Sequence, residues 1–485
     1  MANGTHAEGR RGAAARMAGI LAALLSAGCA GVPDARDMRE IRAAAAATRV
    51  RELAERQPTP SAAYLAGPLT LAASVATALE QNRTLQQERQ GPELARGRIQ
   101  ASYAEALPSL ALTGGYVRRD EELGGVADGQ HVTTRFQDQY NAGLKLTQPI
   151  YNGRIGSALR AARLYEAWAA AGVRDATDEV RFAVVRAYYD AVLSDRLLEV
   201  NLAALETATA QRTTARARRR QGMASNYDEL RAEVEVSNFQ AQVLQARNNK
   251  DLARTTLFRL LGASPESEVE LVDDIPLVSE DISFAEAART ALERRADLTE
   301  AEYALRMQRE SVAAAQGRYL PDVSGYASQA WANPDPHQST RDEWGDEWQA
   351  GVQLSWPLFD GFGRSGALIQ ERARLRQMEI ALQDAEERAV SQIRQAVMSL
   401  RTAEEFARSQ SQNLDTAQEA LRLVEAGLRE GQNTPLEVMD ARQALTKASA
   451  NYYQSLFSHA LARASLQRAM GLMSDGALPD APVLK

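Results

Sequence analysis

The side chains best suited to catalysis or metal binding are scarce in this sequence. Its 485 residues include four histidines and one cysteine. The histidines, at positions 6, 131, 337 and 459, are scattered, and together with one thiol they leave little material for a zinc site or a Cys/His nucleophile pair. A single cysteine also excludes an intrachain disulfide. Because no Walker loop, serine triad or metal-ligand spacing is evident, we predict no enzyme, no metal site and no cofactor.

One glycine-rich motif resembles a dinucleotide-binding fingerprint. Gly361-Phe362-Gly363-Arg364-Ser365-Gly366 follows a strand-like segment, opens a helical segment, and precedes the acidic residues Asp384 and Glu386. The strand of such a site is buried on both faces, whereas this segment is amphipathic, and the helix that follows is several times too long for a βαβ crossover. We therefore interpret these glycines as residues that permit a sharp change from strand to helix.

The overall composition favours long helices over a thick globular core. Hydrophobic residues make up 45% of the chain but aromatic residues only 6%, and alanine is abundant. The 56 basic and 63 acidic side chains give a formal net charge of −7. Since a nucleic-acid binder requires a basic excess, we predict no nucleic-acid partner.

The N-terminus has the pattern of an export signal. Arginines precede a short apolar stretch, residues 17–25, which is too short to span a bilayer and is followed by small residues suited to cleavage. Cys29 stands where a bacterial lipobox has its lipidated cysteine, although Leu25 lies one position earlier than that motif usually requires. We predict a lipoprotein signal peptide at 1–28 and a lipid-anchored arm at 29–68. The alternative is that Cys29 is only a small residue in a cleavage site.

The rest of the chain is an internal duplication. Three pairs of segments match in order at offsets of 208 to 213 residues. They are Leu107-Pro108 with Leu320-Pro321, Gln148–Gly153 with Trp356–Gly361, and Gly222–Ala232 with Gly431–Ala441. A nearly constant offset predicts two repeats, at 69–282 and 283–485.

Each repeat carries two segments that alternate between apolar and polar residues. The predicted strands span about 109–117, 139–148, 322–331 and 348–356, and they are the only strands that we expect, with polar loops at 118–139 and 332–347. Such strands also fit a half-buried antiparallel sheet in a soluble protein. In an exported chain, however, they have the length of membrane-spanning β-strands. Four strands cannot close a barrel, so several chains would have to share one.

Two long proline-free stretches predict helical hairpins. The stretches between Gly153 and Gly222 and between Gly361 and Gly431 would each form a helix roughly 105 Å long. In the second, apolar residues from Leu382 to Ala403 recur at spacings of three and four, as in a coiled coil. The turns are predicted near 222–226 and 431–435, with helices returning antiparallel after them.

Together, the duplication, the Leu-Pro strand entries, the Pro-Ile-Tyr-Asn-Gly and Pro-Leu-Phe-Asp-Gly strand exits and the hairpin turns resemble the TolC-type outer membrane efflux factor family. The lipobox is similar to that of its lipoprotein branch, which serves resistance-nodulation-division (RND) pumps. The resemblance implies a mainly α fold with a small β part, in which four transmembrane strands per chain contribute to a trimeric twelve-strand β-barrel continued by a periplasmic helical tunnel.

The same resemblance implies a passive efflux duct in the outer membrane of a Gram-negative bacterium, anchored by its lipid and extending into the periplasm. Its partners would be outer membrane lipid, a periplasmic adaptor protein and an inner membrane RND-type pump. By resemblance to lipoproteins, Ala30 after the cysteine implies sorting to the outer membrane. The alternative is a non-channel periplasmic coiled-coil lipoprotein with a structural or tethering role, which would not need its strands in the membrane.

The candidate functional residues lie at the two ends of the long helices. Strand–helix transitions are predicted at Pro108, Pro149, Gly153, Pro321, Pro357 and Gly361. Tip turns are predicted at Gly222, Gly431, Thr434 and Pro435, where Ser225 with Asp228 and Thr434 with Glu437 read as capping boxes.

The resemblance assigns a periplasmic aperture to the tips. It implies that Asp440 and Glu437 line the aperture, and we group Asp228 of the first repeat with them; the alternative for each carboxylate is a solvated helix face or a cap. Asn433 stands where some relatives have an arginine latch, so that latch is not expected here. Five arginines crowd the end of the first long helix and are either a solvated face or an adaptor contact. They are Arg212, Arg216, Arg218, Arg219 and Arg220.

Overall fold

The computed structural model describes residues 35–54, 64–127, 130–338 and 342–473. Contacts divide the chain into residues 1–64 and Leu65–Lys485, and the two units are described separately. In the first, α2 (Ala35–Ala54) is a helix whose side chains from 39 to 48 are exposed. Cys29 and the predicted signal peptide lie outside the described residues.

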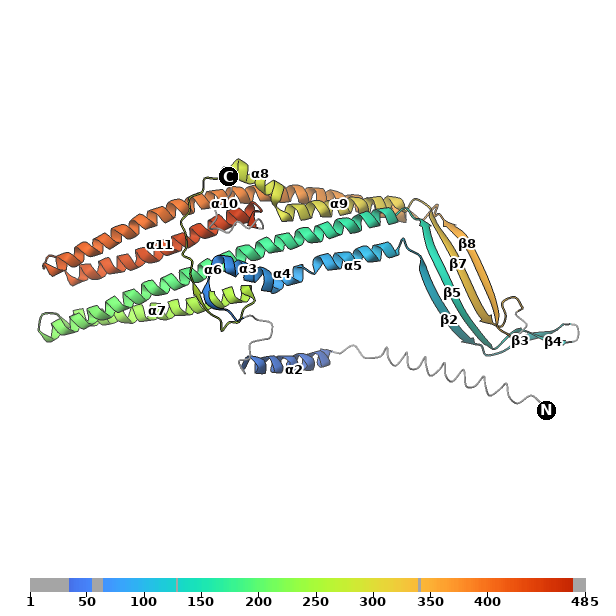
Figure 1. The fold of residues 1–485 in the computed structure, drawn as a ribbon, viewed down its shortest axis with the longest axis horizontal. Coiled ribbons are helices and arrows are strands. Elements are labelled where there is room, and N and C mark those ends of the chain that lie inside the picture. The colour runs from blue at the N-terminus through green and yellow to red at the C-terminus, as the bar shows by residue number, and fades with distance from the viewer. Residues whose placement is uncertain (1–34, 55–63, 128–129, 339–341, 474–485) are drawn as a thin grey trace. The chain divides into compact units, whose positions relative to one another are not determined.

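Helices dominate the second unit and follow the same order twice (Figure 1). The first set is α3 (Leu71–Gln81), α4 (Arg83–Glu88), α5 (Gly91–Ala104), α6 (Ile155–Arg220) and α7 (Asn226–Leu261). The second set is α8 (Phe284–Arg294), α9 (Ala296–Gly317), α10 (Gly363–Arg429) and α11 (Pro435–Ala469). Helices α6 and α10 have 66 and 67 residues, so each is about 100 Å long.

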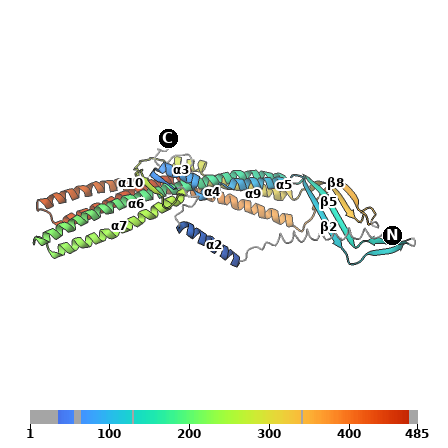
Figure 2. The same cartoon turned by 60° about the horizontal axis from the view of Figure 1, so that its bottom comes forward.

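The long helices form two hairpins, α6 with α7 and α10 with α11, that run side by side (Figure 2). The predicted coiled-coil seam of α10 is confirmed, because Ala389, Ile393, Ala396 and Leu400 are buried. Among the described residues, no helix combines the length and the apolar character that crossing a membrane requires. The predicted fold class, mainly helical with a small strand part, is confirmed.

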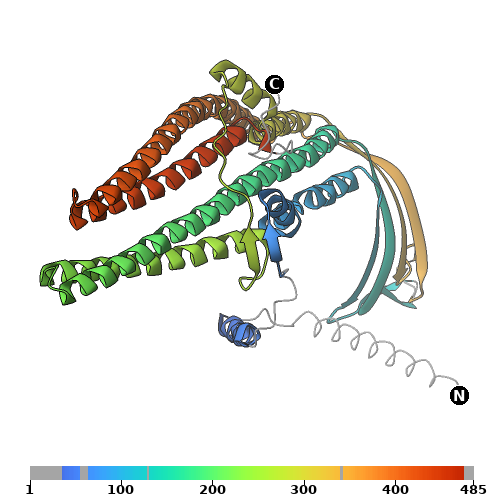
Figure 3. The same cartoon turned by 60° about the vertical axis from the view of Figure 1, so that its left-hand side comes forward.

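A four-stranded antiparallel sheet has the order β2 (Ser109–Arg118), β5 (Asp138–Tyr151), β7 (Asp322–Asn333), β8 (Gly345–Ser355). Pro108 and Pro321 directly precede β2 and β7, which suits a residue without a backbone N–H at the start of a strand. Figure 3 shows the sheet extending beyond the helices of Leu65–Lys485, none of which packs on either of its faces.

The pairing register places most of the large apolar side chains of the four strands on one face of the sheet, although Val117 and Tyr326 lie on the other face and Gln329 and Asp346 lie on this one. The large apolar residues of that face are exposed: Leu110, Leu112, Leu144, Leu146, Trp348, Val352 and Leu354. The opposite face carries polar side chains: Thr113, Lys145, Thr147, Ser324, Ser328, Gln349 and Gln353. This sheet therefore has an apolar face that this chain leaves uncovered, which a soluble protein would normally bury.

The expectation that the chain has only four strands was wrong. Strands β1 (Ala66–Leu69) and β6 (Glu268–Leu271) form a parallel pair, and β3 (Leu123–Ala127) and β4 (Gln130–Arg135) form an antiparallel pair inside the segment predicted as a loop. The β1–β6 pair joins four-residue segments about 200 residues apart, so no local alternation reveals it. The β3–β4 segment is polar and glycine-rich, so its few β-branched residues were not recognised as strand-forming.

The largest core lies midway along the long helices, where α3, α6, α7 and α11 meet. Tyr188 of α6 is fully buried, and its hydroxyl lies 3.0 Å from the Leu69 carbonyl oxygen and 3.1 Å from Asp273 Oδ2. Burial raises the pKa of Tyr188, so the hydroxyl stays protonated and able to donate. These bonds fix β1 and the segment after β6 against α6.

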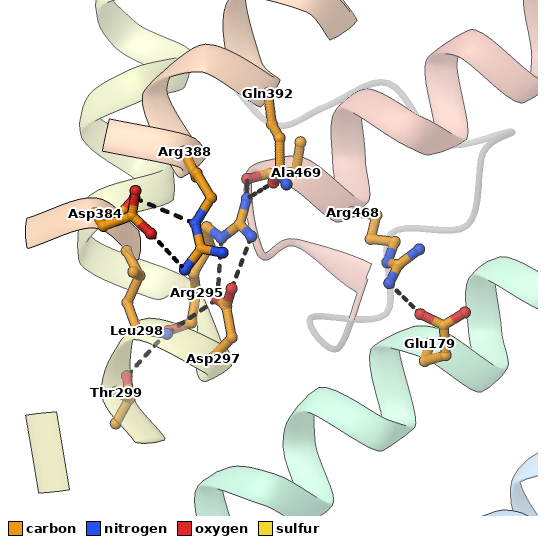
Figure 4. A network of polar contacts seen from close by, with 10 residues as sticks. All are labelled: Glu179, Arg295, Asp297, Leu298, Thr299, Asp384, Arg388, Gln392, Arg468 and Ala469. Atoms are coloured by element: carbon orange, nitrogen blue, oxygen red, sulfur yellow. Dashed lines mark hydrogen bonds and ion pairs between the residues drawn. The ribbon is translucent and has the colours of Figure 1, made fainter. Parts of the chain in front are cut away.

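A polar network at the same level ties the helices of the second repeat together (Figure 4). Arg295, at the start of α9, donates to both carboxylate oxygens of Asp297, at 3.0 and 2.8 Å, and to Gln392 of α10 at 2.8 Å. Arg468 of α11 forms an ion pair with Glu179 of α6 and so joins the two repeats. Burial opposes ionisation of Asp297, but the bonds from Arg295 outweigh it and lower its pKa.

Candidate functional site

The two hairpin turns at the ends of α6 and α10 have the same backbone geometry. Gly222 and Gly431 have φ angles of +74° and +76°, which favour glycine because a side chain would be strained there. In each turn the glycine N–H donates to the carbonyl three residues earlier, and the next N–H donates to the carbonyl five residues earlier, at 2.8 Å. This pattern closes the helix C-terminus in a Schellman motif.

Both predicted capping boxes are present and start the returning helices. Ser225 Oγ accepts from the Asp228 N–H at 3.2 Å, while Asp228 Oδ2 accepts from the Ser225 N–H at 2.9 Å. Thr434 Oγ1 accepts from the Glu437 N–H at 3.4 Å, and Glu437 Oε2 accepts from the Thr434 N–H at 2.7 Å, with Pro435 in the first turn. The hydrogen bonds from Ser225 lower the pKa of Asp228, so this carboxylate is ionised at neutral pH.

Asp440 lies outside the cap and faces the other hairpin. Its Oδ1 is 3.9 Å from Nη2 of Arg231 on α7, and its side chain is 66% exposed. An ion pair this long and this exposed contributes little to stability. Asp440 therefore remains accessible to solvent while a positive charge stands beside it.

Two of the five arginines at the end of α6 form ion pairs within their own hairpin. Arg216 and Arg219 both bind Glu229 of α7, at 2.9 and 2.6 Å, while their side chains remain 47% and 48% exposed. Their hydrogen bonds, from Arg219 first and Arg216 second, lower the pKa of Glu229. These ion pairs close the hairpin just above its turn, and nothing in the sequence spacing indicated Glu229 as their partner.

Arg442, which sequence reasoning missed, joins the two hairpins. Arg442 of α11 donates to Glu425 of α10 at 2.7 Å and to Gln211 of α6 at 2.8 Å. It lines a cavity of about 300 Å³ between the hairpins, together with Glu235 of α7. Burial raises the pKa of Glu235, Arg231 and Arg442 oppose that rise, and Asp440 adds to it. The tips thus carry a network of charges that spans both hairpins.

Asn433 occupies the second turn without linking the hairpins. Its backbone N–H donates to the Gly427 carbonyl at 3.3 Å. A Cβ on Gly427 would lie 2.6 Å from Asn433 Oδ1, so glycine leaves room for this side chain. Asn433 therefore packs within its own turn.

At the end of the helices next to the sheet, the backbone at the start of α6 lies against the backbone at the end of α9. A Cβ on Gly153 would lie 2.6 Å from the Gly317 carbonyl oxygen, so the start of α6 can approach the end of α9 this closely only without a side chain. Arg154 Nη2 lies 3.6 Å from Asp322 Oδ2 at the start of β7. Pro149 lies inside β5, beside an irregularity in its pairing with β7, so the strand continues to Tyr151 before it turns into α6.

The second transition, from β8 to α10, requires two consecutive residues with positive φ. Gly361 has φ +64° and Phe362, the N-cap of α10, has φ +69°, after Pro357 has ended the strand region. Asp360 Oδ2 accepts from the Arg364 N–H at 2.9 Å and from Arg364 Nε at 3.0 Å, which holds the turn. The glycines thus serve a turn from an antiparallel edge strand into a 67-residue helix, which is not the geometry of a dinucleotide site.

No cluster of three or more histidine, cysteine or acidic side chains within the described ranges is arranged to hold a metal ion.

Comparisons with known proteins agree with the duplicated plan. A family model described as outer membrane efflux protein matches twice, at residues 74–263 and 287–472. The alkaline protease secretion protein AprF of Pseudomonas aeruginosa is 23% identical over 72% of this chain and 73% of its own length. A solved structure of a membrane protein from Pseudomonas aeruginosa has a TM-score of 0.73 at 22% identity, covering 83% of this chain and 92% of that one. The channel CusC has a TM-score of 0.71 at 18% identity, over 83% and 92% of the two chains.

Proposed function

The chain belongs to the outer membrane efflux protein family, and from that membership we propose that it is the outer membrane channel of a tripartite export system. It would passively conduct substrates that an inner membrane pump and a periplasmic adaptor deliver. The observation that carries this proposal is the four-stranded sheet, whose exposed apolar face and opposite polar face suit lipid on one side and a water-filled lumen on the other.

The edges of the sheet support a homotrimer. Among the described strands, β2 and β8 each pair on one side only, which leaves a row of backbone N–H and C=O groups open. In lipid each unpaired group costs several kcal/mol, so the strands must pair with another chain. Pairing β8 of one chain with β2 of the next closes a barrel, and three chains of four strands give the twelve-strand barrel of the family.

The tips support a periplasmic aperture. They lie about 100 Å along α6 and α10 from the sheet, so they mark the far mouth of any tunnel that the helices enclose. Threefold symmetry would gather three copies of Asp440 around one axis. Glu437 and Asp228 are engaged in capping and would contribute their charge from the turn, while Arg231 reduces the net negative charge beside Asp440.

The N-terminus supports a lipid anchor at Cys29. Its lipobox-like surroundings support lipidation of this cysteine, and residues 29–68 would then anchor the mature chain to the membrane, as in the branch that serves RND pumps. Acyl chains add about 0.8 kcal/mol per buried CH₂, and the membrane-spanning strands would provide a second attachment that does not depend on the lipid.

One variant distinguishes the channel hypothesis from the alternative of a periplasmic lipoprotein that serves only as a tether. Residues 1–29 are replaced by a cleavable signal peptide without a lipobox cysteine. The duct predicts that the protein still sediments with outer membranes as a heat-resistant oligomer and conducts ions in planar bilayers. Release of a soluble, non-conducting chain would refute the duct and leave the tether. Co-purification of an adaptor and a pump with the native protein tests the tripartite assignment.

A further inference from the structure

A groove between α6 and α9 is lined by arginines. It has a volume of about 440 Å³ and is bounded by Arg160, Arg163, Leu164, Arg306, Arg309 and Glu310. A volume of this size accommodates a small ligand or a headgroup. Four guanidinium groups against one carboxylate give the lining an excess of positive charge.

The groove lies close to the sheet. Helix α6 begins next to the Gly153–Gly317 contact, and the four arginines are seven to eleven residues from it along α6 or α9. At 1.5 Å per residue their backbones lie roughly 10 to 17 Å from the junction. The arginines thus form one band around the helices just beyond the end of the strands.

The carboxylates near the groove do not neutralise it. Glu310 binds Arg160 at 2.8 Å, and Glu302 lies 3.5 Å from Arg306. Arg163 donates only to the Tyr103 hydroxyl, at 3.1 Å, and Arg309 has no hydrogen bond or ion pair among the described residues. Two guanidinium groups therefore have no anionic partner among the residues that the structure describes.

Aromatic side chains mark where a bilayer would end. Trp356, Phe359 and Phe362, at the junction of β8 and α10, are 55%, 76% and 75% exposed. Exposed aromatic residues of this kind gather at the boundary between hydrocarbon and headgroups. Headgroups extend roughly 5 to 8 Å beyond the hydrocarbon, and an arginine side chain extends a further 6 Å or so, which brings the arginine band within reach of lipid phosphates.

We propose that this groove binds the phosphate-bearing headgroup of an anionic phospholipid in the leaflet next to the helical end of the sheet. A guanidinium group donates two parallel hydrogen bonds to a phosphate, and basic pockets beside membrane segments recognise anionic headgroups by charge. The inference rests on the proposed function, because it requires the sheet to span the membrane.

The test measures the lipid bound to the full chain. The protein is inserted into nanodiscs of phosphatidylcholine with phosphatidylglycerol, transferred to mild detergent, and the retained lipids are counted by native mass spectrometry. The parent protein is expected to retain phosphatidylglycerol preferentially. Arg163→Gln with Arg309→Gln should weaken this preference roughly 30-fold, at about 1 kcal/mol for each arginine near a lipid surface. Arg309→Gln alone removes no hydrogen bond or ion pair seen within the described part of the chain and should show a smaller loss.

The control is Arg372→Gln. Arg372 lies on α10 nine residues from the start of that helix, at a similar distance from the sheet, but outside the groove. It should leave the preference unchanged; an equal loss would mean that surface charge alone attracts the lipid. No preference for phosphatidylglycerol in an inserted oligomer, or its displacement by millimolar inorganic phosphate as readily as by lipid, would overturn the headgroup site and leave the channel intact. A chain that does not enter nanodiscs would refute the channel and this inference together.

Discussion

An arginine on the apolar face of the sheet should block assembly, whereas an arginine on the polar face should not. Leu144 lies on the apolar face of β5, between β2 and β7, and is exposed. Gln353 of β8 lies on the polar face, opposite Ser324, and the native chain already carries Lys145 on that face. Leu144→Arg and Gln353→Arg therefore add the same side chain to opposite faces of one sheet.

The expected free-energy cost of each arginine follows from its depth in the membrane. Leu144 is near the middle of the 14-residue strand β5, so at a tilt of about 45° it lies roughly 15 Å from either strand end along the membrane normal. An arginine on the lipid face costs about 2 to 4 kcal/mol at the midplane and about 0 to 1 near an interface. We expect about 3 kcal/mol per chain for Leu144→Arg, and about 1 to 2 for Val352→Arg, which lies three residues from the end of β8. A trimer carries three copies, so its total cost is about three times larger.

The assay compares the heat-resistant oligomer of each variant in isolated outer membranes, with total protein as the reference. We expect strong loss for Leu144→Arg, partial loss for Val352→Arg and assembly close to the parent for Gln353→Arg. If Leu144→Arg and Gln353→Arg assemble equally well, both faces of the sheet lie in water, and the argument from its two faces fails.

Three further predictions concern the tips, the helix seam and the N-terminus. Asp440→Asn should lower the cation selectivity of single channels, though less than loss of an unpaired ring would, because Arg231 stands beside it; unchanged selectivity would place the constriction elsewhere. Partial desolvation first, and the charge of Asp297 next, raise the pKa of Asp175 although its side chain is exposed, so folding favours its protonated form and its contribution to stability falls as pH rises through that pKa. Asp175→Asn should therefore raise the thermal midpoint slightly at about pH 7, because solvent screens this exposed group, with a gain that disappears towards about pH 4; a gain that persists at low pH, or is equalled by the control Asp415→Asn elsewhere on the helices, would contradict this cause. Mass spectrometry of membrane-extracted protein should find an acylated Cys29 as the first residue, and an unmodified start elsewhere would remove the lipid anchor alone.

Some parts of the candidate site could be predicted from the sequence because they depend only on residues close together in the chain. A capping box joins residues three apart, so Ser225 with Asp228 and Thr434 with Glu437 were recognisable in the sequence. A glycine that follows a long helical stretch indicates a turn, and the two tip glycines indeed have positive φ. Alternation with period two likewise places Leu144 and Lys145 on opposite faces before any strand is paired.

Other parts depend on which segments the fold brings together. Arg231 faces Asp440, and Arg442 reaches Gln211, across more than 200 residues of sequence. The close approach of Gly153 to Gly317 has the same origin. Neither spacing nor composition encodes such pairs, because the packing of helices that are distant in the sequence decides them.

The sequence by itself determined the duplication, the long helices, the two-faced strands and the caps, since each arises from interactions within a few residues of the chain. Only the tertiary structure decided the register that aligns most of the large apolar residues of the four strands on one face, and the partners of the charges at the tips. It also decided the arginine groove between α6 and α9. Those features arise from contacts between distant segments. Bringing such segments together costs chain entropy, which the interactions of the whole fold offset and no local pattern does.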